Sequence, residues 1–174
     1  MSSLAPQRLG EPPSQLRLQT VPVVSVLLAS ALPMMLPLIA EWAYLPPLGL
    51  LLFLAWRLLH PSLWPVWIGL PLGLWDDLVS GQPVGAAMGL WTIALLAIDF
   101  IDQRTYWRGY WQDWLIAAIA TSVIIIAGAA LAHPQAGAEL ILSLVGLQIA
   151  ASILLFPMMV RVAAWLDRVR LYRR

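Results

Sequence analysis

The chain has 174 residues, of which 61% are hydrophobic and 11% are charged, and its formal net charge is +1. Soluble domains contain about 45–50% apolar and about 25% charged residues, so this composition indicates an integral membrane protein. The sequence contains no cysteine, which excludes disulfides, thiolate metal sites and cysteine nucleophiles.

Six apolar segments follow one another along the chain, separated by short connections that are polar or contain proline and glycine. A helix that spans a bilayer needs about 20 residues, and on this basis we predict six transmembrane helices. They lie near 21–40, 45–59, 62–79, 84–101, 114–132 and 139–165. The predicted fold is therefore all-α and polytopic, with a membrane domain over 21–166 between an N-terminal tail over 1–20 and a basic C-terminal tail over 167–174.

Prolines and segment lengths predict irregular features in three of these helices. Pro33 and Pro37 lie inside the first segment, where each removes a backbone hydrogen bond, so we expect a kink or an irregular end. The second segment is short for a full crossing, and Pro46 and Pro47 fit its first turn. The last segment is about 40 Å long, which predicts a tilt or an extension beyond Pro157.

Arginines supply every basic residue of the chain, and all ten fall on one side of the six-helix arrangement. They are Arg8, Arg17, Arg57, Arg104, Arg108, Arg161, Arg168, Arg170, Arg173 and Arg174. Because positive residues favour the cytoplasmic side, we predict that both termini are cytoplasmic. This topology accounts for the arginines at the C-terminal end, so they do not point to nucleic-acid binding.

Most aromatic residues are expected near helix ends, as in the aromatic belts at membrane interfaces. Those near the predicted cytoplasmic ends are Trp56, Trp64, Trp67, Tyr106, Trp107, Tyr110, Trp111, Trp114 and Trp165, and those near the outer ends are Trp42, Tyr44 and Trp75. Only Trp91 is central in its segment. We interpret these residues as interfacial anchors and not as a ligand cage.

Two adjacent carboxylates, Asp76 and Asp77, interrupt the apolar stretch over 69–89. An ionisable residue near mid-membrane costs roughly 2.5–3.5 kcal/mol on insertion scales, so such residues are functional or are held by partners. Three interpretations stay open: the aspartates cap the start of the next helix, line a polar outer cavity, or take part in chemistry. Neighbours in sequence do not face each other on a helix, so an acid–base pair made of these two is not predicted.

Glycines recur at intervals of four on both sides of this acidic pair. Gly69 and Gly73 precede the turn, and Gly81, Gly85 and Gly89 follow at the turn and beyond it. Small residues at this spacing let helix backbones approach closely, so we predict tight packing of the third and fourth helices through Gly69, Gly73, Gly85 and Gly89. Glycine and proline over 80–83 predict a compact turn.

Other polar residues carry weaker signals. His133 and Glu139 lie on an outer connection, and two residues are too few for a metal site. Asp99 and Asp102 share a helix face beside Arg104, which indicates a local charge cluster at the interface. No cofactor or metal is predicted.

Signatures of catalysis are missing from the sequence. It contains no glycine-flanked serine elbow, no histidine pair of the metalloprotease type and no lysine for a phosphate-binding loop. An intramembrane hydrolase built on Ser80 would need His133 to approach from a separate loop. We therefore do not expect an enzyme.

The acidic turn resembles the signature of MreD, the rod shape-determining membrane protein family of bacteria. The residues that carry the resemblance are Gly73, Asp77, Leu78, Ser80, Gly81, Pro83 and Gly85, and it extends to Pro47-Leu48, to the turn over 57–61 and to the arginine-rich end. It covers about two-thirds of the chain if the helix count is included. Asp77 matches the family's aspartate, whereas Asp76 is an additional carboxylate.

The resemblance implies a six-helix fold similar to the substrate-binding S-components of ECF vitamin transporters. It also implies a non-enzymatic scaffold of the cell-elongation machinery that associates with MreC and helps to position peptidoglycan synthesis. The further partners implied are the penicillin-binding transpeptidase, RodA, the actin-like MreB and membrane lipid. The alternative hypothesis is a small-molecule-binding subunit of a transporter, with a polar pocket near Glu41, Asp76, Asp77 and Ser80.

Overall fold

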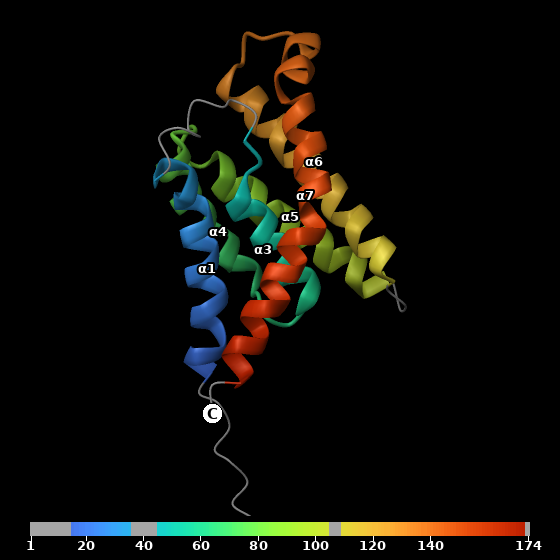
Figure 1. Ribbon diagram of the computed structural model, residues 1–174. Coiled ribbons are helices and arrows are strands. Elements are labelled where there is room, and N and C mark those ends of the chain that lie inside the picture. The colour runs from blue at the N-terminus through green and yellow to red at the C-terminus, as the bar shows by residue number, and fades with distance from the viewer. Residues whose placement is uncertain (1–14, 36–44, 105–108, 173–174) are drawn as a thin grey trace, which may run out of the picture.

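A computed structural model describes residues 15–35, 45–104 and 109–172, and this part of the chain is helical apart from turns and short connections. The elements in order are α1 (Gln15–Met35), α3 (Leu48–Leu59), the 3-10 helix η1 (Val66–Ile68), α4 (Gly69–Ser80), α5 (Ala86–Arg104), α6 (Tyr110–Ala132) and α7 (Ala138–Tyr172). Successive α-helices run in opposite directions (Figure 1), so the bundle has two ends. The all-α class is therefore confirmed.

The two ends of the bundle differ in charge. We call the end with the start of α1 and the end of α7 the basic end, because Arg57, Arg104, Arg168 and Arg170 lie there. The opposite end holds the α4–α5 turn over 81–85 and the α6–α7 connection over 133–137, and we call it the hairpin end. Neither of these two connections contains an arginine.

Three helices are long and apolar enough to cross a membrane: Ala86–Arg104, Tyr110–Ala132 and Ala138–Arg170. Helices α3 and α4 have 12 residues each, or about 18 Å, whereas the hydrocarbon core of a bilayer is about 30 Å thick. The molecule is thus consistent with a membrane protein. Six complete crossings stay a prediction.

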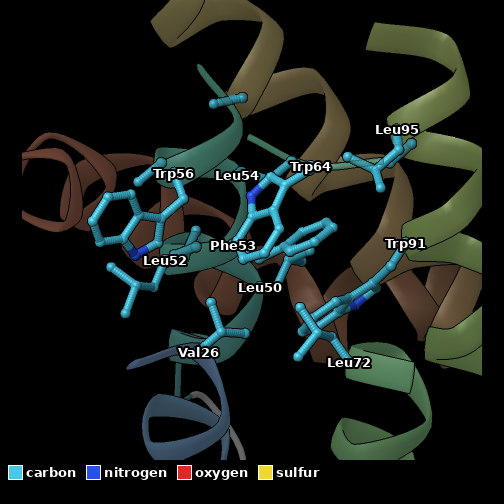
Figure 2. Packing of buried hydrophobic residues seen from close by; sticks show 14 of the residues in the cluster. Val26, Leu50, Leu52, Phe53, Leu54, Trp56, Trp64, Leu72, Trp91 and Leu95 are labelled. Atoms are coloured by element: carbon cyan, nitrogen blue, oxygen red, sulfur yellow. The ribbon is translucent and has the colours of Figure 1, made fainter. Parts of the chain in front are cut away.

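Helix α3 lies inside the bundle and not on its surface. Every residue from 49 to 57 is buried, and α1, α6 and α7 all pack against α3 (Figure 1). Its sequence is apolar around the whole circumference, which is typical of a helix enclosed by protein. At its centre Phe53 stacks on Trp91 at 4.8 Å between ring centroids and lies 5.8 Å from Trp64 (Figure 2).

Two tryptophans predicted to be interfacial anchors belong to this core. Trp56 is fully buried and Trp64 is 5% exposed, because the short α3 and the connection after it end within the bundle. The Trp56 indole Nε1 donates a hydrogen bond to the Ser25 hydroxyl of α1 at 3.0 Å. Exposed tryptophans, as expected of anchors, are Trp67, Trp75, Trp111 and Trp165, while Trp42, Tyr44, Tyr106 and Trp107 lie outside the described residues.

The second and third helices start later in the sequence than predicted, and prolines precede both starts. Pro46 and Pro47 precede α3 and do not occupy its first turn, and the Pro47 carbonyl accepts the first hydrogen bond, from Leu51. The third helix was predicted from 62, but its regular turns begin only after Pro65, which lacks an amide donor.

The outer helices are longer than predicted at the basic end. Helix α1 begins at Gln15 and accommodates Pro33, while Pro37 lies outside the described residues. Helix α7 runs for 35 residues through Pro157 to Tyr172, so most of the predicted C-terminal tail is helical. This length agrees with the extension expected of the last segment.

A buried arginine connects α3 to α5 at the basic end. Arg57 is 2% exposed and forms ion pairs with Asp99 and, at 2.9 Å, with Asp102. The charge cluster predicted around Asp99 and Asp102 is therefore present, but its cation is Arg57. Arg104 instead places its guanidinium over the Phe100 ring at 4.3 Å.

A second polar network joins α7 to the residue that follows α3. The His60 imidazole Nε2 lies 3.1 Å from the Asp167 carboxylate, and the Arg170 guanidinium lies 2.7 Å from the same carboxylate. Arg170 also lies over the Trp56 ring at 5.7 Å. Helix α3 is thus held to both α5 and α7 by charged groups at the basic end.

Replacing Arg57 with glutamine should lower the free energy of unfolding by about 3 kcal/mol, because two carboxylates lose a buried partner. Unfolding by SDS titration in detergent micelles measures this change. Arg104→Gln is the matched control, since Arg104 is exposed, and it should change the free energy by no more than about 0.5 kcal/mol. Equal effects of the two substitutions would contradict the assigned role of Arg57.

Candidate functional site

The turn between α4 and α5 depends on two glycines in the left-handed region of φ. Gly81 ends α4 with φ 71° and ψ 17°, and its amide donates to the Asp77 carbonyl at 3.1 Å. Gly85, just before α5, has φ 98°. Side chains with a Cβ rarely adopt these angles, so both positions need glycine for the backbone itself.

Asp77 caps the first turn of α5. Its side chain is 1% exposed, and its carboxylate accepts hydrogen bonds from the amides of Gly85 at 2.8 Å, Ala87 at 2.8 Å and Met88 at 3.3 Å. These amides have no partner within their own helix, and the positive end of the helix dipole favours an anion. The capping interpretation is confirmed for Asp77, and both of its oxygens are engaged in it.

Close packing of α4 on α5 occurs at two of the four glycines predicted for it. A Cβ on Gly73 would lie 2.6 Å from the Met88 backbone, and one on Gly69 would lie 2.9 Å from the Thr92 backbone. A Cβ on Gly85 or Gly89 would have no heavy atom within 4 Å. The packing role predicted for these two is wrong, because Gly85 belongs to the turn and Gly89 does not face α4.

Asp76 points away from the cap and lines two cavities at the hairpin end. The central cavity, about 310 Å³, lies between α3, α5, α6 and α7, and a second cavity of about 350 Å³ lies toward α1. The two cavities share Pro47, Asp76, Gln82 and Gln148 in their walls. The adjacent aspartates therefore have separate positions: one is closed off by backbone amides and the other faces open space.

Polar groups from distant parts of the chain meet beside Asp76. Gln148 of α7 donates its amide Nε2 to the Leu45 carbonyl at 2.9 Å. Ser30 of α1 lies next to Asp76. The Ser30 hydroxyl also packs against Gly49 of α3, and it fits there only because residue 49 is glycine: a Cβ on residue 49 would lie 1.9 Å from Ser30 Oγ. The site thus combines α1, α4 and α7.

The remaining predicted residues fall at different places. Ser80 lines the cavity toward α1, whereas His133 lines the central cavity, so the two do not share a site. Pro83 is exposed in the turn, and its carbonyl accepts the Ala86 amide at 3.0 Å. Glu41 lies outside the described residues. Within the described residues, no group of three His, Cys, Asp or Glu side chains could hold a metal ion.

Three polar residues of the cavity walls were not predicted as site residues from the sequence. Gln82 was assigned only to the turn, His133 only to a loop, and Gln148 to no site. Each is an isolated polar residue, and the signal they share is polarity near the same end of the bundle. Their convergence depends on contacts between helices far apart in sequence.

Replacing Asp77 with alanine should lower the free energy of unfolding by at least about 2 kcal/mol, because three backbone amides lose their acceptor. Hydrogen exchange offers a local readout: the amides of residues 85, 87 and 88 should exchange faster. Asp76→Ala is the matched control, since Asp76 accepts none of these bonds. Unchanged exchange at the three amides in Asp77→Ala would refute the capping role.

Comparisons of this chain with protein-family models, with curated proteins and with solved structures gave no match.

Proposed function

We propose that this chain is a non-enzymatic membrane scaffold of the bacterial cell-elongation machinery, similar to MreD, that associates with MreC and helps to position peptidoglycan synthesis. The observation that carries the proposal is the geometry of the motif on which the resemblance depends. Gly73 admits the α5 backbone, Asp77 caps α5, and Gly81 and Gly85 form the turn. A motif whose residues hold α4 and α5 together suits a scaffold, because a scaffold needs its helices in fixed positions.

The proposed threading has six crossings of the inner membrane with both termini in the cytoplasm, in a fold similar to ECF S-components. The charge difference between the basic end and the hairpin end supports this orientation, since arginines favour the cytoplasmic side. The short α3 does not need to match the bilayer thickness on its own, because α1, α6 and α7 pack against it.

Broad apolar faces on α5, α6 and α7 offer surfaces for lipid and for the membrane helix of a partner. Exposed residues on these faces are Ile93, Leu96 and Phe100 of α5, Leu115, Ile119 and Val123 of α6, and Leu140, Leu147 and Leu154 of α7. We assign the single membrane helix of MreC to one of these faces. Through MreC the scaffold would reach the penicillin-binding transpeptidase and RodA, with MreB near the basic end.

A second candidate function, a small-molecule-binding subunit of a transporter, is favoured by the central cavity. Its volume of about 310 Å³ falls at the lower end of the range typical of ligand sites, about 300–1,000 Å³. Its wall is mainly apolar with a few converging polar groups, which is the usual composition of such sites. This candidate would make the hairpin end a ligand entrance, whereas the scaffold requires only that the bundle keeps its shape.

Gentle solubilisation with crosslinking should capture a bitopic membrane protein together with this chain, and depletion of the chain should convert rod-shaped cells to spheres. The physical reason is that the partner's helix needs an apolar face of the bundle. Asp76→Asn provides the control, because it alters a cavity and not these faces, and capture should be unchanged. Rods of normal shape after depletion would sink the scaffold proposal.

The absence of cysteine makes the orientation directly measurable. Single cysteines placed at Ser80 and at Arg104 should react with a membrane-impermeant maleimide from opposite sides of the inner membrane. We expect labelling of residue 80 in spheroplasts and of residue 104 only in inverted vesicles, because the arginine-bearing end faces the cytoplasm. The reverse pattern, or reaction of both residues from one side, would overturn the six-crossing threading.

A further inference from the structure

We propose that the central cavity binds a small organic cation, a protonated amine with an apolar body, and that the carboxylate of Asp76 holds its charge. This inference rests on the second candidate function, binding of a small molecule, and is independent of the scaffold. It is drawn from the unequal surroundings of two neighbouring aspartates, from the composition of the cavity wall and from the positions of the arginines.

The first argument is charge. Asp77 is compensated by three backbone amides at the start of α5, whereas Asp76 forms no ion pair within the described residues. The chain contains no lysine, and the described arginines at helix ends lie at the basic end. The neighbour of Asp76 on α1, Ser30, is neutral. A carboxylate removed from water is costly without a counter-charge, and a cationic ligand would supply it.

The second argument is the wall of the central cavity. Its apolar part comes from four helices and includes Leu50, Trp91, Ile124, Leu144 and Val145. This surface suits a hydrocarbon or aromatic body. A purely hydrophilic ion would leave this apolar surface without contacts, so the ligand should combine one charge with an apolar part.

The third argument is the set of acceptors beside Asp76. The amide nitrogen of Gln148 donates to the Leu45 carbonyl, which leaves its carbonyl oxygen as the group to accept from a ligand. Gln82 Oε1 lies beside Gly128, 3.5 Å from the position that a Cβ there would take, and both residues line the central cavity. An ammonium group donates up to three hydrogen bonds, and one carboxylate with two amide oxygens can accept them.

The same wall disfavours anions. Among the described residues, no arginine lines either cavity, and His133 is the one ionisable side chain besides Asp76 in the wall of the central cavity. A phosphate or carboxylate ligand would approach the charge of Asp76 without an arginine in the described wall to offset the repulsion. Gln82 and His133 are both exposed, so the cavity is reached from the hairpin end.

The test uses the full chain in nanodiscs of zwitterionic phosphatidylcholine and three probes of nearly equal size: 2-phenylethylammonium, 2-phenylethanol and phenylacetate. Isothermal titration calorimetry should detect the ammonium probe binding more tightly than the other two. Asp76→Asn keeps the shape of the side chain and removes its charge, so it should weaken binding of the ammonium probe by about tenfold or more. Its effect on 2-phenylethanol should be less than about threefold.

Two further variants make the result specific to the cavity. Glu139→Gln removes another carboxylate at the hairpin end, one that is exposed and outside both cavities, and it should leave binding unchanged. Ala132→Phe narrows the cavity at the exposed end of α6 and should weaken ammonium binding by at least about tenfold without touching Asp76. This variant also keeps the test decisive if Asp76→Asn fails to insert.

Failure of this proposal can be told apart from failure of the scaffold. No binding of the ammonium probe to the wild-type chain, or equal binding by wild type and Asp76→Asn, would overturn the cation site. Neither result affects capture of the bitopic partner, which is measured without any probe. Loss of partner capture alongside normal ammonium binding would remove the scaffold and keep the cation site.

Discussion

The hydrogen bonds between the Asp77 carboxylate and the first amides of α5 are the interaction on which the arrangement of this protein depends. The first amides of a helix have no carbonyl partner within the helix, and at the start of α5 one carboxylate accepts from three amides. The cap fixes where α5 starts relative to the end of α4. It therefore places Gly73 against Met88 and brings Trp91 to the centre of the core.

Charged side chains are compensated by different groups at the two ends of the bundle. At the basic end, Arg57 pairs with two carboxylates, and His60 and Arg170 share Asp167, so α3 is attached to α5 and α7. At the hairpin end, backbone amides compensate Asp77, and Asp76 lies on open space. The central helix α3 connects the two arrangements, since its start borders the cavities and its last turn carries the buried arginine.

The two adjacent aspartates have different surroundings, and each of them suits one of the two proposed functions. The carboxylate that matches the MreD-like motif is structural, and this suits a scaffold whose helices must keep fixed positions. The additional carboxylate lies where a ligand could reach it from the hairpin end.

Local features of the chain determined much of this architecture. Apolar segment lengths predicted the helices, the arginine pattern predicted that one end is basic, and the aspartates before a glycine-rich turn indicated a helix cap as one of three interpretations. Pairings between distant segments could not be predicted in this way. The burial of Trp56 and Trp64, the choice of Arg57 as partner for Asp99 and the convergence of Gln82, His133 and Gln148 all depend on which helices lie side by side. Helical periodicity states which face of a helix a residue occupies but not what lies opposite, and only the tertiary structure decided that.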